Sequence, residues 1–253
     1  RAMTGSLAES WDVSDGGTTF TIKIRDGVYW HDKAPVNGRE MTVQDVEHSF
    51  HRMLGSKLTG TAFGSDEPSP GAGSLGGLAW DSVEAVDDST LVIKLQEPSF
   101  FGLRFTLDWY SMFVVPPEMV ETYGDDWDWD KVVGTGPYTI TASAPGVGMT
   151  YTKNPNYWKN DEKFPQNRLP YIDEVKGVEI TERASWLAGL RTGQIDYIGW
   201  QGVTHLNNID EKESLERTNP ELVIRPWSER SEASHIFNIK KPPFDDVRVR
   251  RAM

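Results

Sequence analysis

Cysteine is absent from the 253-residue chain. Disulfide bonds, thiolate metal sites and cysteine nucleophiles are therefore excluded. No stretch approaches the roughly 20 consecutive apolar residues that a membrane-spanning helix needs. The first residues lack the apolar segment of a signal peptide, so none is expected, but a processed chain would lack it too. Cytoplasm and periplasm therefore both stay open on these grounds.

Basic residues are scarce, because 26 Lys and Arg stand against 38 Asp and Glu, which gives a net charge of −12. A protein that binds DNA or RNA gains affinity by neutralising phosphates with Lys and Arg. The basic cluster of Arg248, Arg250 and Arg251 stands close to the last residue. The charge balance therefore argues against a nucleic-acid partner.

Aromatic side chains are abundant, at 11% of the chain with ten tryptophans. Together with an apolar share of 38%, they supply enough burial area for one large domain or two ordinary ones, which excludes disorder for the chain as a whole. Trp and Tyr combine a wide apolar face with a polar edge, which suits recognition of peptides or sugars in a cleft. We expect most of these rings in the core and two or three facing a ligand.

Local patterns in the first half predict strands and one long helix. A strand is expected over 18–24, where polar and apolar residues alternate. A helix is expected to follow Thr42, with Asp45 completing a capping box and Gly55 ending it. Its apolar stripe consists of Val43, Val46, Phe50, Met53 and Leu54.

Farther along, Ser, Gly and Pro dominate 64–77, which predicts a long loop. A hairpin is expected where 83–86 and 91–95 flank a polar turn. A short helix is expected over 118–123, after a Pro-Pro pair.

The last third alternates predicted strands with predicted helices. We expect strands over 175–180, 195–200, 222–227 and 234–240. One helix is expected to be capped by Thr181 and ended by Gly193, and a second to cover 203–215. The strand–helix–strand order implies parallel pairing with right-handed crossovers, and the fold class is mixed α/β.

Two patterns imitate ligand sites without the context that such sites need. Residues 71–76 match GxGxxG, but prolines precede them, so no strand leads into the motif. Asp126, Asp128 and Asp130 alternate as in an EF-hand, yet the loop positions that need Gly and Glu hold Lys131 and Pro137. We therefore expect no metal and no cofactor.

Histidines give no stronger indication of chemistry. His48 and His51 have a spacing that can bind metal, but no third ligand is near, so surface or half-buried histidines are expected. His31 is expected to be hydrogen-bonded structure rather than a catalytic base. Neither a Ser elbow, an HExxH motif nor a P-loop occurs, so an enzyme is not expected.

Eight blocks of sequence occur in an order that resembles one family. They are LAESW (7–11), RDGVYWHD (25–32), TVQDV (42–46), GTGPY (134–138), NPNYW (154–158), LPYID (169–173), LRTGQID (190–196), and FN (237–238) with PPFDDVRVR (242–250). Over nearly its whole length the chain resembles the bacterial extracellular solute-binding proteins of family 5, which are the dipeptide, oligopeptide and nickel-type components of ABC importers.

The resemblance implies a fold of the type II periplasmic-binding-protein kind, in which two lobes close over a solute. Family members are longer than this chain, so it is expected to be a fragment of the first lobe. Residues 1–170 would form an extra, hairpin-rich α+β subdomain. Residues 171–253 would form part of the α/β ligand-binding lobe, with the second lobe absent.

The same resemblance implies a function without covalent chemistry. The protein would capture a peptide-like solute and deliver it to the membrane permease of an ABC importer. It is expected to be a monomer in the periplasm or outside the cell, with a membrane anchor left open.

Four residues are expected to bind the ligand. Trp200 and Gln201 follow a predicted strand, at the end where α/β sheets bind ligands. Trp109 and Tyr110 precede the Pro-Pro pair. The nickel-type branch places a basic residue in this second region, and this chain has none between Arg104 and Lys131, so a chelated metal is disfavoured as cargo.

Other motif residues are interpreted as folding devices. Gly134 and Gly136 are expected to adopt backbone conformations closed to other residues, with Pro137 fixing the entry to a strand. The turn at 154–156 is expected to aim the rings of 157–158 inward.

Three alternatives stay open. One is an oligosaccharide-binding receptor of the same family. Another is a secreted hydrolase using carboxylates such as Glu179, Asp196 or Asp210, two of which would have to approach within about 5–10 Å. The third is a partner that presents a ligand to a membrane receptor.

Overall fold

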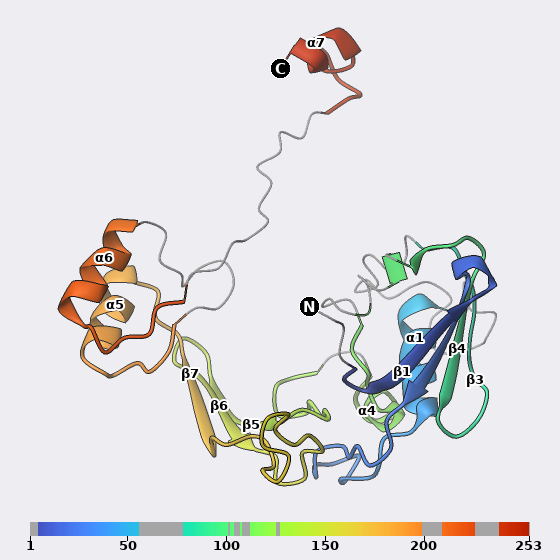
Figure 1. Cartoon of the computed structure of the whole chain (residues 1–253), viewed down its shortest axis with the longest axis horizontal. Coiled ribbons are helices and arrows are strands. Elements are labelled where there is room, and N and C mark those ends of the chain that lie inside the picture. The colour runs from blue at the N-terminus through green and yellow to red at the C-terminus, as the bar shows by residue number, and fades with distance from the viewer. Residues whose placement is uncertain are drawn as a thin grey trace. The chain divides into compact units, whose positions relative to one another are not determined.

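The computed structural model describes residues 5–55, 78–100, 102–103, 107, 112–124, 127–198, 209–225 and 238–252. The chain divides into two compact units, residues 1–179 and 180–253 (Figure 1). Each unit is described by itself. The predicted long loop over 64–77 lies outside the described residues.

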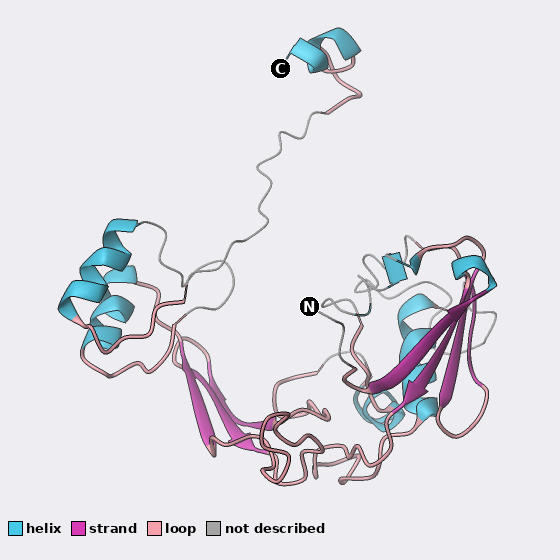
Figure 2. Cartoon of the chain, viewed as in Figure 1, coloured by secondary structure: helices cyan, strands magenta, loops and turns pink. Residues whose placement is uncertain are grey.

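The first unit begins with a four-stranded antiparallel sheet in the order β1-β2-β4-β3 (Figure 2). Its strands are β1 (Ala8–Ser14), β2 (Thr19–Ile24), β3 (Trp80–Ala85) and β4 (Thr90–Leu95), with a 3-10 turn η1 (Asp15–Gly17) between the first two. The alternating pattern of β2 is confirmed, because Phe20, Ile22 and Ile24 are buried. The predicted β3–β4 hairpin is confirmed as well.

Helix α1 (Val43–Leu54) packs on β3 and β4 and closes the core of this unit. The predicted capping box is present. Four members of the predicted apolar stripe are buried and Met53 is half-buried. Phe50 lies against Trp80 with ring centroids 6.0 Å apart. The helix ends at Gly55, whose amide donates to the His51 carbonyl oxygen.

The short helix α4 (Pro117–Tyr123) confirms the prediction over 118–123 and buries Met119 beneath it. It contacts α1, and Met119 belongs to the same apolar core as the buried residues of α1 and of the first sheet.

A second antiparallel sheet has the order β5-β6-β7, with β5 (Tyr138–Ala144), β6 (Gly148–Lys153) and β7 (Glu174–Val178). The cross-strand register places Ile140, Tyr151 and Val175 on one face. The other face carries Thr139, Thr152 and Glu174, so each strand alternates apolar with polar side chains. All five residues of β7 are exposed.

The second unit holds α5 (Arg183–Arg191), α6 (Ile209–Thr218) and α7 (Val247–Ala252). Trp186 and Leu187 of α5 pack on Leu215 of α6 as a small core. Arg183 pairs with Glu211 across the two helices. Before α7, the Asp246 carboxylate accepts a hydrogen bond of 2.8 Å from the Arg248 amide.

Among the strands that were expected to pair in parallel, β7 is described, and it pairs antiparallel with β6, so the prediction is wrong for this strand. The described residues 195–198, 222–225 and 238–240 form no strand. Ile195, Ile198, Leu222 and Ile224 are half-buried and pack on the α5–α6 core, a burial that needs no strand pairing. The remainder of the expected strands, and 203–208 of the second helix, lie outside the described residues.

Two helix boundaries also differ from the prediction. Helix α5 begins at Arg183, with Glu182 rather than Thr181 at the cap position, because the Glu182 carbonyl accepts the first helical hydrogen bonds from Ser185 and Trp186. Helix α6 continues to Thr218.

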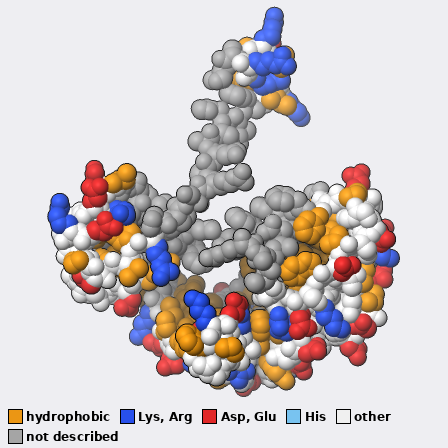
Figure 3. Space-filling view, in the orientation of Figure 1, with side chains coloured by type: hydrophobic (Ala, Val, Ile, Leu, Met, Phe, Trp, Pro, Cys, Tyr) orange, Lys and Arg blue, Asp and Glu red, His pale blue; other side chains and the backbone are white. Residues whose placement is uncertain are grey.

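Charged side chains of both signs lie on the face of the molecule shown in Figure 3. The acidic and basic side chains are interspersed on this face, with Lys and Arg gathered at α7. Over the described residues, none of the helices has the length and apolar character needed to cross a bilayer.

Candidate ligand-binding site

All four predicted ligand-binding residues, Trp109, Tyr110, Trp200 and Gln201, lie outside the described residues. Their role therefore stays a prediction. The described neighbours are the segment 112–116, which leads into α4, and residues 195–198, of which Asp196 and Tyr197 are exposed.

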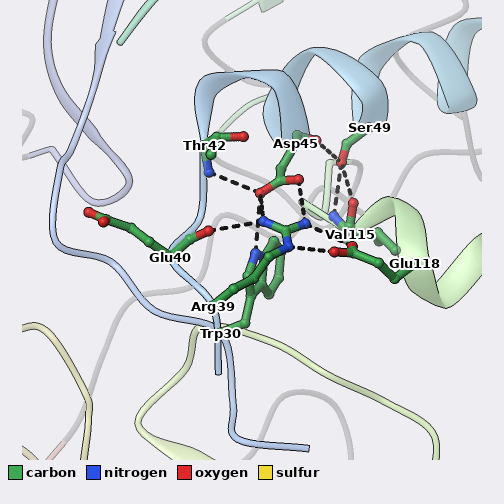
Figure 4. A network of polar contacts seen from close by, with 8 residues as sticks. All are labelled: Trp30, Arg39, Glu40, Thr42, Asp45, Ser49, Val115 and Glu118. Atoms are coloured by element: carbon green, nitrogen blue, oxygen red, sulfur yellow. Dashed lines mark hydrogen bonds and ion pairs between the residues drawn. The ribbon is translucent and has the colours of Figure 1, made fainter. Parts of the chain in front are cut away.

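A polar network fixes α4, and with it the segment that follows the first predicted ligand-binding pair (Figure 4). The Arg39 guanidinium donates to both Asp45 oxygens at 2.8 Å. Its other edge donates to the Glu118 oxygens at 2.5 and 2.7 Å. Arg39 therefore joins α1 to α4 through two forked ion pairs, a geometry that lysine cannot reproduce.

Asp45 is the buried centre of this network, with an exposed fraction of 3%. Its carboxylate also accepts hydrogen bonds from the Trp30 indole at 3.2 Å and from the Thr42 amide at 2.9 Å. On the other side, hydrogen bonding to Arg39 lowers the pKa of Glu118, and Glu118 and Asp45 together raise the pKa of Arg39. Arg39 and Glu118 are therefore both charged at neutral pH.

Ser49 ties the segment before α4 to α1 in a second place. Its hydroxyl accepts from the Val115 amide at 2.9 Å and donates to the Asp45 carbonyl oxygen at 2.7 Å. Sequence reasoning missed both links, because Arg39 and Glu118 are 79 positions apart and neither belongs to a recognisable motif.

Three of the family-like sequence blocks meet at His31. The Gly134 amide donates to His31 Nδ1 at 3.3 Å, and His31 Nε2 lies 3.0 Å from the Gly136 carbonyl oxygen. The same oxygen accepts from the Asn154 side-chain amide at 3.0 Å. The prediction that His31 is hydrogen-bonded structure is confirmed.

The expected backbone role of the glycines beside it is wrong. Neither Gly134 nor Gly136 has a positive φ. A Cβ on Gly134 would lie 3.7 Å from the His31 ring, an ordinary contact. These residues act through the amide and carbonyl groups that they offer to His31. Pro137 does precede β5, as predicted.

An open recess of about 450 Å³ lies where residues of the blocks 7–11, 25–32 and 154–158 approach one another. It is lined by Gly5, Glu9, Arg25, Asp26, Gly27, Trp158, Lys159, Asn160 and Glu162. Arg25 stacks over the Trp158 ring at 5.0 Å from its centroid and lies 3.7 Å from Glu9. Lys159 pairs with Glu162 at 3.0 Å. The cations of the recess are therefore already paired within the protein.

The ring of Trp158 is half-buried and packs against the core of the first unit. Tyr157 is half-buried beside it, with centroids 5.6 Å apart. The prediction that this turn, at 154–156, aims the rings inward is confirmed for Trp158, and Tyr157 lies beside that ring.

His48 and His51 are buried on α1, with exposed fractions of 6% and 5%, rather than at the surface. Among the described residues, His, Asp and Glu side chains form no group of three or more that could hold a metal ion. Burial, and secondarily the Arg52 charge, lowers the pKa of His48 to about 4. Its neighbours Asp45 and Glu118 oppose this shift, and His51 adds to it.

Acid should therefore destabilise the chain through His48. The unfolded state binds the proton near pH 6.5 and the folded state only near pH 4, so stability is fully present above pH 6.5 and falls between these values. The contribution is at most about 3 kcal/mol. Urea unfolding of wild type and His48→Gln from pH 7.5 to 4 measures it. Wild type should lose more stability than the variant, and parallel curves would contradict the assignment.

The sequence of the chain is similar to that of known binding proteins. The family described as bacterial extracellular solute-binding proteins, family 5 Middle, matches residues 2–253. The chain is 27% identical over 254 residues to the probable deoxycholate-binding periplasmic protein YgiS of Escherichia coli, covering 97% of this chain and 43% of that protein. It is 27% identical over 259 residues to the periplasmic oligopeptide-binding protein OppA of Escherichia coli, covering 98% and 43%.

Solved structures give the same picture. The periplasmic binding protein DppA of Helicobacter pylori, in complex with the peptide STSA, aligns with a TM-score of 0.63 and 26% identity, covering 84% of this chain and 40% of that one. The binding protein MoaA of A. tumefacien R10, in complex with mannopinic acid, aligns with a TM-score of 0.68 and 25% identity, covering 98% and 44%. The chain thus spans less than half the length of these relatives, and the predicted mixed α/β fold of a partial lobe is confirmed.

Proposed function

Because the chain belongs to the bacterial extracellular solute-binding proteins of family 5, we propose that the whole protein captures a peptide-like solute for an ABC importer. The match over residues 2–253 carries this proposal. Its support for a peptide comes from relatives such as the oligopeptide-binding OppA and the DppA structure that holds STSA. OppA, DppA and MoaA are all named as binding proteins, which favours capture over catalysis.

Within this function, Trp109, Tyr110, Trp200 and Gln201 are the proposed solute contacts. Flat aromatic faces pack on apolar side chains or peptide planes, and an amide pairs with peptide groups. The supporting observation is that Arg39 fastens α4 and Ser49 fastens Val115 before it, so the segment that follows Tyr110 in the chain is held in place. Residues 1–170 remain proposed as the extra subdomain and 171–253 as part of the ligand-binding lobe.

The hydrolase alternative has less support. The Glu179 carboxylate accepts a hydrogen bond of 3.1 Å from the Gly146 amide and so fastens the β5–β6 turn to the end of β7. This gives one of the candidate carboxylates a structural role. A periplasmic or extracellular location, a monomeric state and a permease partner are part of the proposal.

Calorimetric titration of the complete natural protein tests the proposal. The ligands are trialanine, tetra-alanine, deoxycholate and maltotriose, at the same buffer and temperature. Saturable binding of a peptide supports the proposed function. Binding of deoxycholate or maltotriose alone would replace the solute class, and turnover of any of them would overturn a pure binding role.

Trp200→Ala in the complete protein should weaken binding of the best peptide by about tenfold to a hundredfold, which corresponds to loss of one buried aromatic contact. Its melting temperature should stay close to that of wild type. Phe164→Ala is the matched control, because this exposed aromatic lies in a loop that has no proposed ligand role. Equal affinity of Trp200→Ala and wild type would remove Trp200 from the site, and a large fall in melting temperature would assign it to the core.

A further inference from the structure

His31 is held by backbone groups on both sides of its ring. Its exposed fraction is 6%. The His31 amide donates to the Gly134 carbonyl oxygen at 2.8 Å, so main chain and side chain bind the same glycine. With the hydrogen bonds at Nδ1 and Nε2, three bonds join the loop before α1 to the segment that enters β5.

These contacts specify one protonation state. Nδ1 faces an N–H donor and must be bare, whereas Nε2 faces a carbonyl oxygen and must carry the proton. The neutral Nε2–H tautomer satisfies both partners. Protonation would add a hydrogen to Nδ1, which faces the Gly134 N–H, so that the hydrogen bond between them would be lost.

The surroundings act in the same direction. The Lys33 ammonium disfavours a positive charge on the His31 ring, and the Asp130 carboxylate in turn favours the charged form of Lys33. The groups presented by 134–136 and by Asn154 are neutral amides and carbonyls. Burial is the largest cause that lowers the pKa of His31, and the hydrogen bond to Gly136 opposes it.

The hydrogen bonds of His31 connect two parts of the first unit. The Gly136 carbonyl oxygen accepts hydrogen bonds from His31 Nε2 and from the Asn154 side-chain amide. The Asn154 backbone amide donates to the Pro137 carbonyl oxygen at 2.8 Å. Residues 134–137 enter β5 and Asn154 leaves β6. The histidine therefore binds the second sheet of the first unit to the loop that fills the core beside the first sheet.

We propose that His31 is a protonation-sensitive clasp between the 28–38 loop and the 134–136 segment, which three hydrogen bonds hold while its imidazole is neutral and which acid weakens by removing the one at Nδ1. The proposal does not depend on the identity of the solute or on transport. It would stand if the protein bound something other than a peptide, so its test is separate from that of the proposed function.

Nitrogen-15 NMR of the full chain tests the clasp without any substitution. At pH 7.5, Nδ1 of His31 should give the shift of a bare nitrogen and Nε2 that of a protonated one. The ring should titrate below the ordinary histidine value. An Nδ1–H tautomer, or titration at or above that value, would overturn the proposal.

Hydrogen exchange gives the mechanical readout. As His31 protonates, the protection factor of the Gly134 amide should fall by about tenfold, the equivalent of one net hydrogen bond. The Met41 amide, which donates to the carbonyl oxygen of Val28 at the start of this loop at 2.7 Å, is the internal control and should keep its protection while His31 titrates. An unchanged ratio of the two protection factors would refute the clasp.

Two variants separate the hydrogen bonds from the charge. His31→Gln keeps one donor and one acceptor but cannot titrate, so Gly134 protection should be retained at pH 7.5 and lose its acid dependence. His31→Phe should lose the protection of the Gly134 amide both at pH 7.5 and in acid. Acid dependence that persists in His31→Gln would assign the effect to another group and contradict the proposal.

Discussion

Replacing Arg39 by alanine is expected to lower the free energy of unfolding by about 3 kcal/mol, the lower end of the range for breaking a buried ion pair. The substitution leaves the Asp45 carboxylate, which is 3% exposed, without its cationic partner. The Trp30 indole and the Thr42 amide would still solvate it in part. Urea unfolding of the full chain, followed by tryptophan fluorescence, measures the change.

The size of the loss should depend on the planar fork of donors. Arg39→Lys restores the charge but not the bidentate geometry, so it should recover only part of the stability. Glu118→Gln removes the more exposed arm of the network and should cost about 1 kcal/mol. If Arg39→Ala cost no more than Glu118→Gln, the network would be a surface ion pair and not the fastening of α4.

A methyl group on Gly148 should disrupt the second sheet. Gly148 has φ +140, and a Cβ there would overlap the Gly177 carbonyl oxygen on the neighbouring strand. Since both groups are main chain, neither can turn away, and β6 and β7 must separate. Gly148→Ala should therefore cost about 3 kcal/mol, combining backbone strain with steric overlap. Amide exchange across the β6–β7 ladder should rise in the variant.

Gly146→Ala is the matched control, two positions away in the same turn. Gly146 also has a positive φ, +74, but no atom lies within 4 Å of the position that a Cβ would take. The cost should be the left-handed strain alone, about 1–2 kcal/mol. If the two substitutions lowered the free energy of unfolding equally, β6 and β7 would accommodate the Gly148 Cβ at no cost, and the prediction would be wrong.

Local order was predictable from the sequence where one short-range signal decided it. The alternation of β2 and the capping box of α1 are examples, because both depend on residues only a few positions apart. Ile195 and Leu222 show the limit. Their short apolar runs suit a strand or a segment that covers a helix equally, so periodicity does not separate the two, and in the structure both residues pack on the α5–α6 core without forming a strand.

The candidate site was also predictable only in part from the sequence. The eight sequence blocks were enough to indicate the family, which the match over residues 2–253 confirms. His31 was predicted as structure, yet its partners Gly134 and Gly136 lie more than a hundred positions away and carry no complementary side chain. Pairing through main-chain groups leaves no signature in residue types, so it could be found only from the fold.

The strand order β1-β2-β4-β3 has a kinetic consequence. Each outer pair is a hairpin between neighbours in sequence, and hairpins of this kind close in about 1–10 μs. The central β2–β4 ladder instead joins segments such as Lys23 and Thr90, far apart along the chain. Closing that wide loop costs conformational entropy before the ladder's hydrogen bonds form. Docking of the two finished hairpins should therefore be the rate-limiting step in formation of the sheet.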